Sequence, residues 1–220
     1  MSDGSNVVRS VYRAEWKTGA TAQQAEDLVG NISALRTKID HEILTVSLFQ
    51  WDEMLFIYSE GIDSPFDPNT HLDCGDLGLA KWPGGESGAR WWVPMMDIFH
   101  YNQPKDVGQW RRKAPVDIPF GRVIRLRPDM VSSYIFYHYQ LQEERLGFGD
   151  KYGIIVMHEN LLFFYQENPR VIEDAPFPGK LETTNTPSGW QELMGKHFAP
   201  WTDRGEEIWR PIELLVTIGL

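Results

Sequence analysis

The chain has 220 residues, which is enough for one or two domains with a sizeable core. Its formal net charge of −10 argues against a nucleic-acid-binding surface, which needs clustered basic side chains, and against binding to an anionic membrane surface. A single cysteine, Cys74, excludes an internal disulfide framework. The sequence also has no apolar run of membrane-spanning length and no hydrophobic leader, so we expect a cytoplasmic protein.

The same aromatic and apolar pattern occurs twice in the sequence. The segment 55–60, LFIYSE, returns as LFFYQE at 162–167. Two tryptophans return in the same order, each roughly 100 residues later: Trp92 as Trp190, and Trp110 as Trp209. The duplication predicts two repeats, at residues 7–118 and 121–220.

The first half begins with a strand and a helix. Residues 7–16 mix β-branched and aromatic side chains with partial alternation, which predicts a strand. Thr21 is a suitable N-cap for a helix over 22–38, where apolar residues recur at three- and four-residue spacing. Strands over 43–49 and 54–59 are then expected to form a hairpin.

A long loop, a second helix and a last strand complete the first half. Residues 61–89 are rich in Gly, Pro, Asp and Ser, and long ordered loops in compact domains are often functional. We expect a helix over 89–99, although Pro94 must either delay its start or bend it, and a strand over 110–116. The first half is therefore interpreted as a βαββαβ unit.

The second half repeats this order. Its predicted elements are strands at 122–126, 152–157, 161–166 and 207–218, and helices at 130–145 and 190–198. A sheet with its helices on one face needs a cover for the other face, and a second sheet can supply it. The predicted fold is therefore α+β: two tandem ferredoxin-like βαββαβ units with antiparallel sheets packed face to face as a fused dimeric α+β barrel. We expect a monomer, as a fused pseudo-dimer, or a homodimer.

Two groups of residues are candidates for chemistry. Trp91 and Trp92 are adjacent on a predicted helix, about 100° apart, so one ring can face the core and the other the rim of a pocket. Tyr134 and His138 lie four residues apart on one helix face, and a phenol beside an imidazole is a proton-transfer pair. Both groups are also compatible with simple core packing.

Several common catalytic motifs are missing. No grouping of His, Cys, Asp and Glu has zinc-ligand spacing, and no glycine-rich loop has the pattern that binds phosphates. No serine occupies a G-x-S-x-G turn. We therefore expect neither a metal nor a cofactor.

With these residues placed, the chain resembles the L-rhamnose mutarotase family of the dimeric α+β-barrel superfamily. Three segments carry the resemblance: Arg90-Trp91-Trp92 with Met95, the pair Tyr134 and His138, and the hairpin over 152–167. The resemblance implies a carbohydrate-binding isomerase in which His138 moves protons at the ring oxygen and anomeric hydroxyl of a monosaccharide, assisted by Tyr134. It also implies four sugar contacts: Arg90, Trp91, Trp92 and Tyr152.

Other functions remain open, because the Trp pair lies in the first repeat and the Tyr/His pair in the second. One alternative is a non-catalytic or oxygenase-like barrel that binds an apolar ligand between its sheet and its helices. Another is a barrel whose long loops bind a protein partner. Fold alone does not decide between them. A sugar site needs several converging hydrogen-bonding groups, whereas an oxygenase-like site is mostly apolar, so pocket polarity discriminates the first two.

Overall fold

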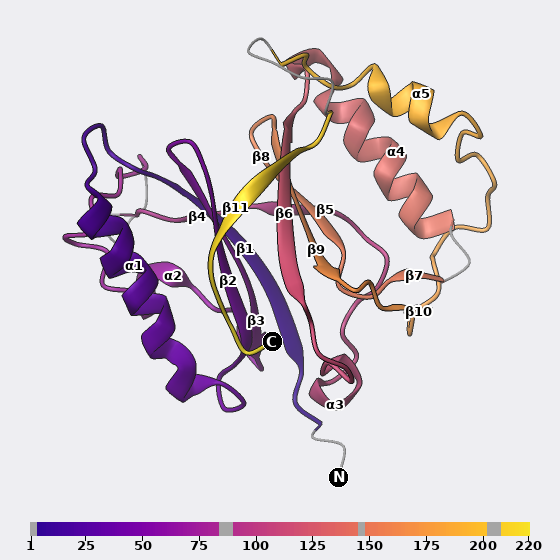
Figure 1. Ribbon diagram of the computed structural model, residues 1–220. Coiled ribbons are helices and arrows are strands. Elements are labelled where there is room, and N and C mark those ends of the chain that lie inside the picture. The colour runs from indigo at the N-terminus through magenta and orange to yellow at the C-terminus, as the bar shows by residue number, and fades with distance from the viewer. Residues whose placement is uncertain (1–3, 84–89, 145–147, 202–207) are drawn as a thin grey trace. The chain divides into compact units, whose positions relative to one another are not determined.

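The computed structural model describes residues 4–83, 90–144, 148–201 and 208–220. The chain divides into two compact units, each an antiparallel sheet with helices against it (Figure 1). Unit 1 comprises Met1–Met95, Pro104–Pro119 and Ile212–Leu220, and unit 2 comprises Met96–Gln103 and Phe120–Pro211. The predicted α+β class with antiparallel sheets is confirmed.

Unit 1 contains a five-stranded sheet and one long helix. Its elements are β1 (Val7–Glu15), α1 (Ala22–Ala34), η1 (Leu35–Lys38), β2 (Ile43–Trp51), β3 (Met54–Ile62), α2 (Pro68–His71), β4 (Val93–Pro94), α3 (Val107–Trp110) and most of β11 (Arg210–Ile218). The strands follow the order β4-β1-β3-β2-β11, and each neighbouring pair is antiparallel. The first four strands thus have the order of a ferredoxin-like sheet, with the second helix reduced to the single turn α2.

Helix α1 begins where the sequence predicts. The Thr21 hydroxyl accepts a hydrogen bond from the Gln24 amide at 3.3 Å, and the Gln24 side chain accepts one from the Thr21 amide at 3.0 Å. This capping box satisfies two backbone donors that the first turn leaves without partners. Leu28 and Ile32, one turn apart, are buried against the sheet with Ile57. The predicted 22–38 helix is therefore confirmed as α1 followed by η1.

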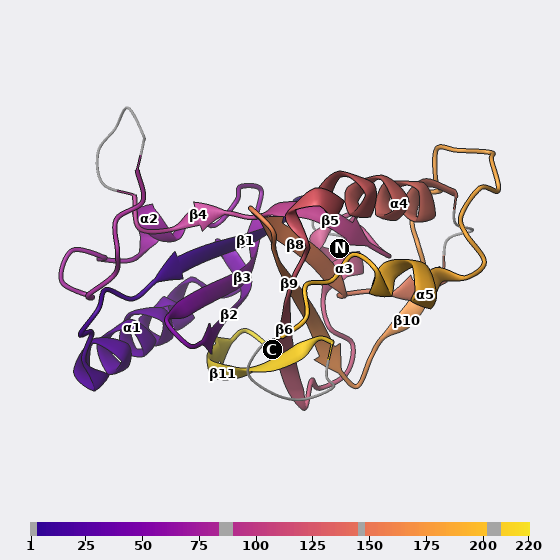
Figure 2. The ribbon, with the colours of Figure 1, turned by 90° about the horizontal axis from the view of Figure 1, so that it is seen from above.

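Unit 2 contains a four-stranded sheet, a small two-stranded sheet and two helices. Its elements are β5 (Met96–His100), most of β6 (Ile118–Arg125), η2 (Pro128–Met130), α4 (Val131–Glu144), β7 (Phe148–Asp150), β8 (Ile154–His158), β9 (Leu161–Asn168), β10 (Ile172–Asp174) and α5 (Trp190–Gly195). The main sheet has the order β6-β9-β8-β5, and β7 pairs with β10. Helices α4 and α5 lie side by side on the same face of the main sheet (Figure 2).

The core of unit 2 lies between its helices and its sheet. Tyr134 on α4 and Met194 on α5 pack against Ile124, Leu126 and Leu162 of the sheet region. The predicted hairpin of the second half is confirmed as β8 and β9, whose pairing includes Val156 opposite Phe163. Within the described ranges, no helix combines the length and apolar character that crossing a membrane requires.

The repeated sequence pattern has a repeated structural role. Tyr58 donates a hydrogen bond to Glu60 at 2.6 Å in β3, and Tyr165 donates one to Glu167 at 2.8 Å in β9. All four residues are fully buried. Side chains two positions apart share a face of a strand, so this spacing lets a tyrosine satisfy a buried carboxylate next to it.

The expected helix over 89–99 is wrong. The chain there forms the short strands β4 and β5, and Met95 joins them. Pro94 cannot continue a helix because it lacks the backbone donor and its ring clashes with the preceding turn. Valine, isoleucine and phenylalanine, which favour strands, surround it in the sequence. Ala89, where that helix was expected to begin, lies outside the described residues, as do Arg145 and Glu207 at the ends of two other predicted elements.

The expected strand over 110–116 is also wrong. The chain instead makes the helical turn α3, whose N-cap is Asp106. The Asp106 carboxylate accepts a hydrogen bond from the Gln109 amide at 2.7 Å, and Trp110 ends the turn. Residues 111–117 then form bends and irregular backbone. Pro115, which has no backbone donor, disfavours ladder pairing in this segment.

The buried carboxylate of Glu60 provides a test of the fold of unit 1. Arg112 forms an ion pair with both of its oxygens, one of them at 2.9 Å. Burial raises the pKa of the Glu60 carboxyl, but the Arg112 charge and its hydrogen bonds outweigh burial and hold this pKa below its ordinary value. Removing one partner of such a pair leaves the other charge buried without its counter-ion.

We therefore expect Glu60→Gln to lower the free energy of unfolding by about 3–5 kcal/mol, measured by urea unfolding at neutral pH. The matched control is Glu42→Gln, which removes a carboxylate from the surface pair with Lys38. Because exposed pairs contribute little, the control should unfold at the wild-type urea concentration. Equal effects of the two substitutions would contradict the role given to Glu60.

Candidate functional site

A cavity of about 480 Å³ lies in unit 2, between the helices and the sheet. Its walls come from α4, α5, β5, the β8–β9 hairpin and the small β7–β10 sheet. The lining residues are Phe99, Tyr101, His138, Leu141, Phe148, Gly149, Asp150, Gly153, Ile154, Ile155, Phe164, Gln166, Arg170, Ile172 and Trp190. Most of these are aromatic or aliphatic, and the volume is in the range of cavities that hold small molecules.

The periodicity of helix α4 and of strand β9 determines which of their side chains face the cavity. His138 and Leu141 are three residues apart on α4 and therefore lie on one face of that helix. On β9, Phe164 and Gln166 face the cavity, whereas the intervening Tyr165 lies on the other face of the sheet. Trp190 opens α5 and adds a ring from the second helix.

Three rings surround the His138 imidazole. The Phe99 ring lies 5.6 Å away, centroid to centroid, and the Trp190 ring 5.0 Å away, both in edge-to-face arrangements. The Tyr134 ring lies beneath the imidazole at 4.0 Å, tilted by 31°. His138 is 4% exposed, so the imidazole is almost fully removed from water.

The hydrogen bonding of His138 fixes its tautomer. Its Nδ1 lies 2.9 Å from the backbone carbonyl oxygen of Tyr134. A carbonyl only accepts, so Nδ1 carries the proton and Nε2 presents a lone pair. No residue in the described part of the chain donates a hydrogen bond to Nε2. The cavity therefore contains an available acceptor in apolar surroundings.

The charge state of His138 follows from its burial. Burial lowers the pKa of the imidazole to about 4, despite the smaller opposing effect of the hydrogen bond to the Tyr134 carbonyl. His197 lowers this pKa further through its charge. His138 is therefore neutral at pH 7, with only about one molecule in a thousand protonated.

Several polar groups of the cavity wall already have hydrogen-bond partners. Gln166 donates a hydrogen bond to Asp150 Oδ2 at 2.5 Å. The other oxygen of Asp150 accepts from the amides of Tyr152 and Gly153, at 3.2 and 3.3 Å. Arg170 is exposed and has no hydrogen bond or ion pair with any residue in the described ranges. It places an available positive charge at the rim.

The small β7–β10 sheet forms the outer wall beside that rim. Phe148 is 64% exposed, and Ile172 is 43% exposed. Gly149 lies directly against the Tyr101 ring, and a Cβ atom at Gly149 would come within 2.3 Å of that ring. Glycine is needed here because any side chain would displace Tyr101, which itself lines the cavity.

The loop before α5 is tied to the end of α4. Gly179 lies so close to the Glu143 carbonyl oxygen that a Cβ atom would come within 2.1 Å of it. The Glu144 carboxylate accepts hydrogen bonds from Thr183, Asn185 and Thr186. Burial acts to raise the pKa of Glu144, but these hydrogen bonds lower it to about 2. These contacts hold the segment that leads into Trp190.

The predicted site residues lie in both units. In unit 2, His138 lines the cavity, while Tyr134 is buried beneath it in the core and Tyr152 is buried beside it. Burial raises the pKa of the Tyr134 phenol, so the phenol stays protonated. The structure brings Tyr134 and His138 into ring contact, but no hydrogen bond joins the Tyr134 hydroxyl to the imidazole.

The predicted sugar contacts in the first repeat lie in unit 1. Trp91 and Trp92 precede β4 and are not helical. Trp92 is fully buried in the hydrophobic core, and the Trp91 ring is half-buried with Lys81 Nζ 5.8 Å from its centroid. Arg90 forms a backbone bridge with Trp82. In unit 1 the Trp pair therefore packs the core and its edge.

Unit 1 fills the space that is open in unit 2. The loop between β3 and β4 supplies five side chains that pack against α1 and the sheet: Phe66, Leu72, Leu77, Leu79 and Trp92. Its path is fixed by Asn69, whose side chain bonds to the backbone of both Trp91 and Trp92. The long loop thus contributes to the core on the helix side of the sheet.

The sequence reasoning missed most of the cavity wall. Phe99, Phe164, Trp190 and Arg170 were not candidates, although Trp190 was recognised as the repeat of Trp92. The surroundings of these two tryptophans differ. Trp92 packs with loop residues in the core of unit 1, whereas Trp190 borders the open cavity of unit 2. Among the described residues, no three His, Cys, Asp or Glu side chains lie close enough together to hold a metal ion.

Comparison with known proteins finds two weakly similar solved structures. No family model matches the chain, and no curated protein matches it in sequence. One similar solved structure is a provisionally assigned monooxygenase from Fusobacterium nucleatum subsp. nucleatum, with 9% identity, a TM-score of 0.41, and coverage of 96% of this chain and 94% of that one. Another is an anthrone oxidase-like protein, with 9% identity, a TM-score of 0.41, and coverage of 99% and 95%. Likenesses this weak do not identify an activity.

The expected membership of the L-rhamnose mutarotase family is wrong, as are the isomerase and carbohydrate-binding functions that it implied. No family model matches the chain, and the similar structures are described as a provisionally assigned monooxygenase and an anthrone oxidase-like protein. Physical reasons agree with this correction. The Arg90-Trp91-Trp92 segment is not a helix, and a neutral His138 with a pKa of about 4 supplies almost no acid form at pH 7.

The low pKa of His138 predicts a specific pH dependence of stability. Below the ordinary histidine pKa of about 6.5, the unfolded chain takes up a proton that the folded chain binds only near pH 4. The free energy of unfolding should therefore fall between pH 6.5 and 4, by up to about 3 kcal/mol from this residue. Urea unfolding at pH 7.5 and at pH 4.5 measures this fall in the free energy of unfolding. His138→Phe should lose less stability on acidification than the wild type, and identical losses would refute the burial of a neutral imidazole.

Proposed function

We propose that unit 2 binds a ring-containing, largely apolar small molecule between α4, α5 and the sheet, with a hydrogen-bond donor of the ligand directed at His138 Nε2. The observation that carries the proposal is the cavity itself, whose aromatic and aliphatic walls surround one available acceptor. Flat rings suit such walls because aromatic pairs gain from edge-to-face and offset contacts.

The polarity of the walls favours an apolar ligand over a sugar. A sugar presents hydroxyls in every direction, and each one buried without a partner would cost about 1–3 kcal/mol. The acidic and amide groups of the wall, Asp150 and Gln166, are already bonded to each other. His138 Nε2 and the Arg170 guanidinium form no bond within the described part of the chain and can meet a ligand, one deep in the cavity and one at its rim.

The pKa of His138 favours binding over oxygenase-like chemistry that begins with removal of a phenolic proton. A phenol has a pKa of about 10, whereas that of the imidazole is about 4. Proton transfer would then be uphill by about six pKa units, or about 8 kcal/mol. Accepting a hydrogen bond from the same hydroxyl requires no such transfer. We therefore propose that the cavity of unit 2 has a binding role.

A blocking substitution tests the proposal with 1-naphthol as the probe. Leu141→Trp fills the cavity from α4, while Phe136→Trp adds the same ring to an exposed position of the same helix, where Phe136 is 59% exposed. Isothermal titration calorimetry should detect binding to the wild type and to Phe136→Trp, and at least tenfold weaker binding to Leu141→Trp. His138→Phe should weaken 1-naphthol about tenfold and leave naphthalene unchanged. Equal affinities for both tryptophan variants would overturn the proposal.

Arg170 gives a second prediction about the ligand. An exposed guanidinium at the rim should attract an anionic substituent, with a gain of up to about 1 kcal/mol, or about fivefold in affinity. Arg170→Gln should therefore weaken 1-hydroxy-2-naphthoate about fivefold in calorimetry at low salt while leaving 1-naphthol unaffected. A loss of the same size for both compounds would mean that Arg170 supports the wall and does not select charge.

A further inference from the structure

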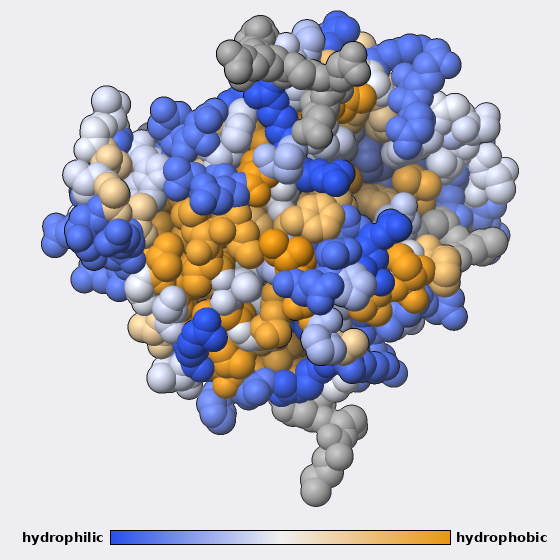
Figure 3. Space-filling model, viewed as in Figure 1, coloured by the Kyte–Doolittle hydropathy of each residue, from blue (hydrophilic) through white to orange (hydrophobic). Residues whose placement is uncertain are grey.

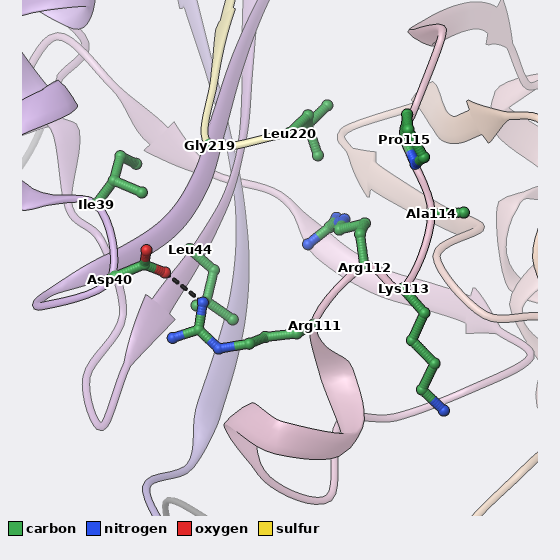
Figure 4. A pocket seen from close by; sticks show the side chains of 10 residues that line it. All are labelled: Ile39, Asp40, Leu44, Arg111, Arg112, Lys113, Ala114, Pro115, Gly219 and Leu220. Atoms are coloured by element: carbon green, nitrogen blue, oxygen red, sulfur yellow. Dashed lines mark hydrogen bonds and ion pairs between the residues drawn. The ribbon is translucent and has the colours of Figure 1, made fainter.

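A second cavity, of about 500 Å³, lies in unit 1 (Figure 4). It is bounded by the end of η1, the start of β2, the end of β11 and the segment that follows α3. It shares no lining residue with the cavity of unit 2. Its chemistry also differs, because three consecutive basic residues border it.

The walls of this cavity are partly apolar. Ile39, Leu44, Pro115 and Leu220 line it, and Leu220 is 38% exposed. Figure 3 shows apolar side chains gathered on the surface over β11, where Leu214, Leu215 and Val216 are only half-buried. The apolar lining residues and the cavity volume of about 500 Å³ leave room for more than a small inorganic ion.

Gly219 shapes the floor of the cavity. Its φ of +82° is in the left-handed region, and a Cβ atom there would come within 2.0 Å of the Leu44 carbonyl oxygen. Glycine thus allows the end of β11 to turn tightly over the start of β2. The turn brings Leu220 to the opening opposite the basic segment (Figure 4).

The three basic residues are in three different states. Arg112 is fixed by its buried ion pair with Glu60. Arg111 pairs with Asp40, but these side chains are 45% and 56% exposed, so the pair is weak and open to exchange. Lys113 forms no hydrogen bond or ion pair with any residue in the described part of the chain. Lys113 is therefore the basic side chain of this segment that no acidic side chain in the described part of the chain neutralises.

That remaining charge is notable in a chain with a net charge of −10. In Figure 4 the Lys113 side chain points away from Arg111, but it is exposed, long and flexible and can turn toward the opening. Arg111 can exchange the Asp40 carboxylate for a ligand carboxylate. We propose that this cavity of unit 1 binds an amphipathic monoanion, a carboxylate on an apolar chain, with the carboxylate held by Arg111 and Lys113 and the chain lying on Ile39, Leu44 and Leu220.

Decanoate is the probe, with decanol and decyltrimethylammonium as uncharged and cationic comparators. Isothermal titration calorimetry is performed on the wild type and on Leu141→Trp, whose unit 2 cavity is blocked. Decanoate should bind both proteins equally, more tightly than either comparator, and more weakly as salt is added. Lys113→Ala and Arg111→Ala should each weaken decanoate about tenfold. Ala114→Trp should prevent binding by filling the cavity from an exposed position of the lining segment.

The matched control is Lys105→Ala, which removes the same charge from an exposed position outside the cavity. It should bind decanoate like the wild type. The proposal is overturned if decanoate does not bind, if decanol binds equally well, or if Lys105→Ala and Lys113→Ala weaken binding to the same extent. Loss of binding in Leu141→Trp would instead assign decanoate to the unit 2 cavity and also overturn the proposal.

Discussion

The apolar helix-side face of each sheet must be covered, and the way in which each unit covers it determines whether a space remains between helices and sheet. Unit 1 uses α1 and the long loop between β3 and β4, whose side chains, Trp92 among them, complete the core. Unit 2 uses α4 and α5, with a loop that is tied to the end of α4 through Glu143 and Glu144. The second arrangement leaves a space of about 480 Å³. The helix side of the sheet is thus filled by loop side chains in unit 1 and partly open in unit 2.

The open interior has an electrostatic consequence. His138 is held on α4 by a hydrogen bond to the helix backbone, so its tautomer is set by its own helix. Burial among rings then keeps it neutral. A neutral acceptor in an apolar space can orient a ligand hydroxyl, because an unmatched donor would carry a desolvation cost there. The proposed binding specificity and the expected pH dependence of stability therefore have one physical origin.

Local patterns made much of the fold predictable. Capping at Thr21, the apolar periodicity of α1 and the two hairpins depend on residues close in sequence, and all were found in the structure. The helix predicted over 89–99 was wrong, because Pro94 and strand-forming neighbours outweighed the helix-like spacing of this segment. The cavity was only partly predictable. His138 was a candidate from its spacing to Tyr134, whereas Trp190 and Arg170 line it through contacts between distant segments. A sequence pattern identifies apolar residues but not the space left between them.

The most direct test of the account is an isotope-filtered NMR measurement of nuclear Overhauser effects between bound 1-naphthol and the methyl groups of the protein. The account predicts contacts to Leu141, Ile154 and Ile155, which line the unit 2 cavity. It predicts none to Ile32 and Leu77, which belong to the filled core of unit 1. Contacts to the unit 1 methyl groups, with none to the three in unit 2, would contradict the claim that the open interior is the binding site.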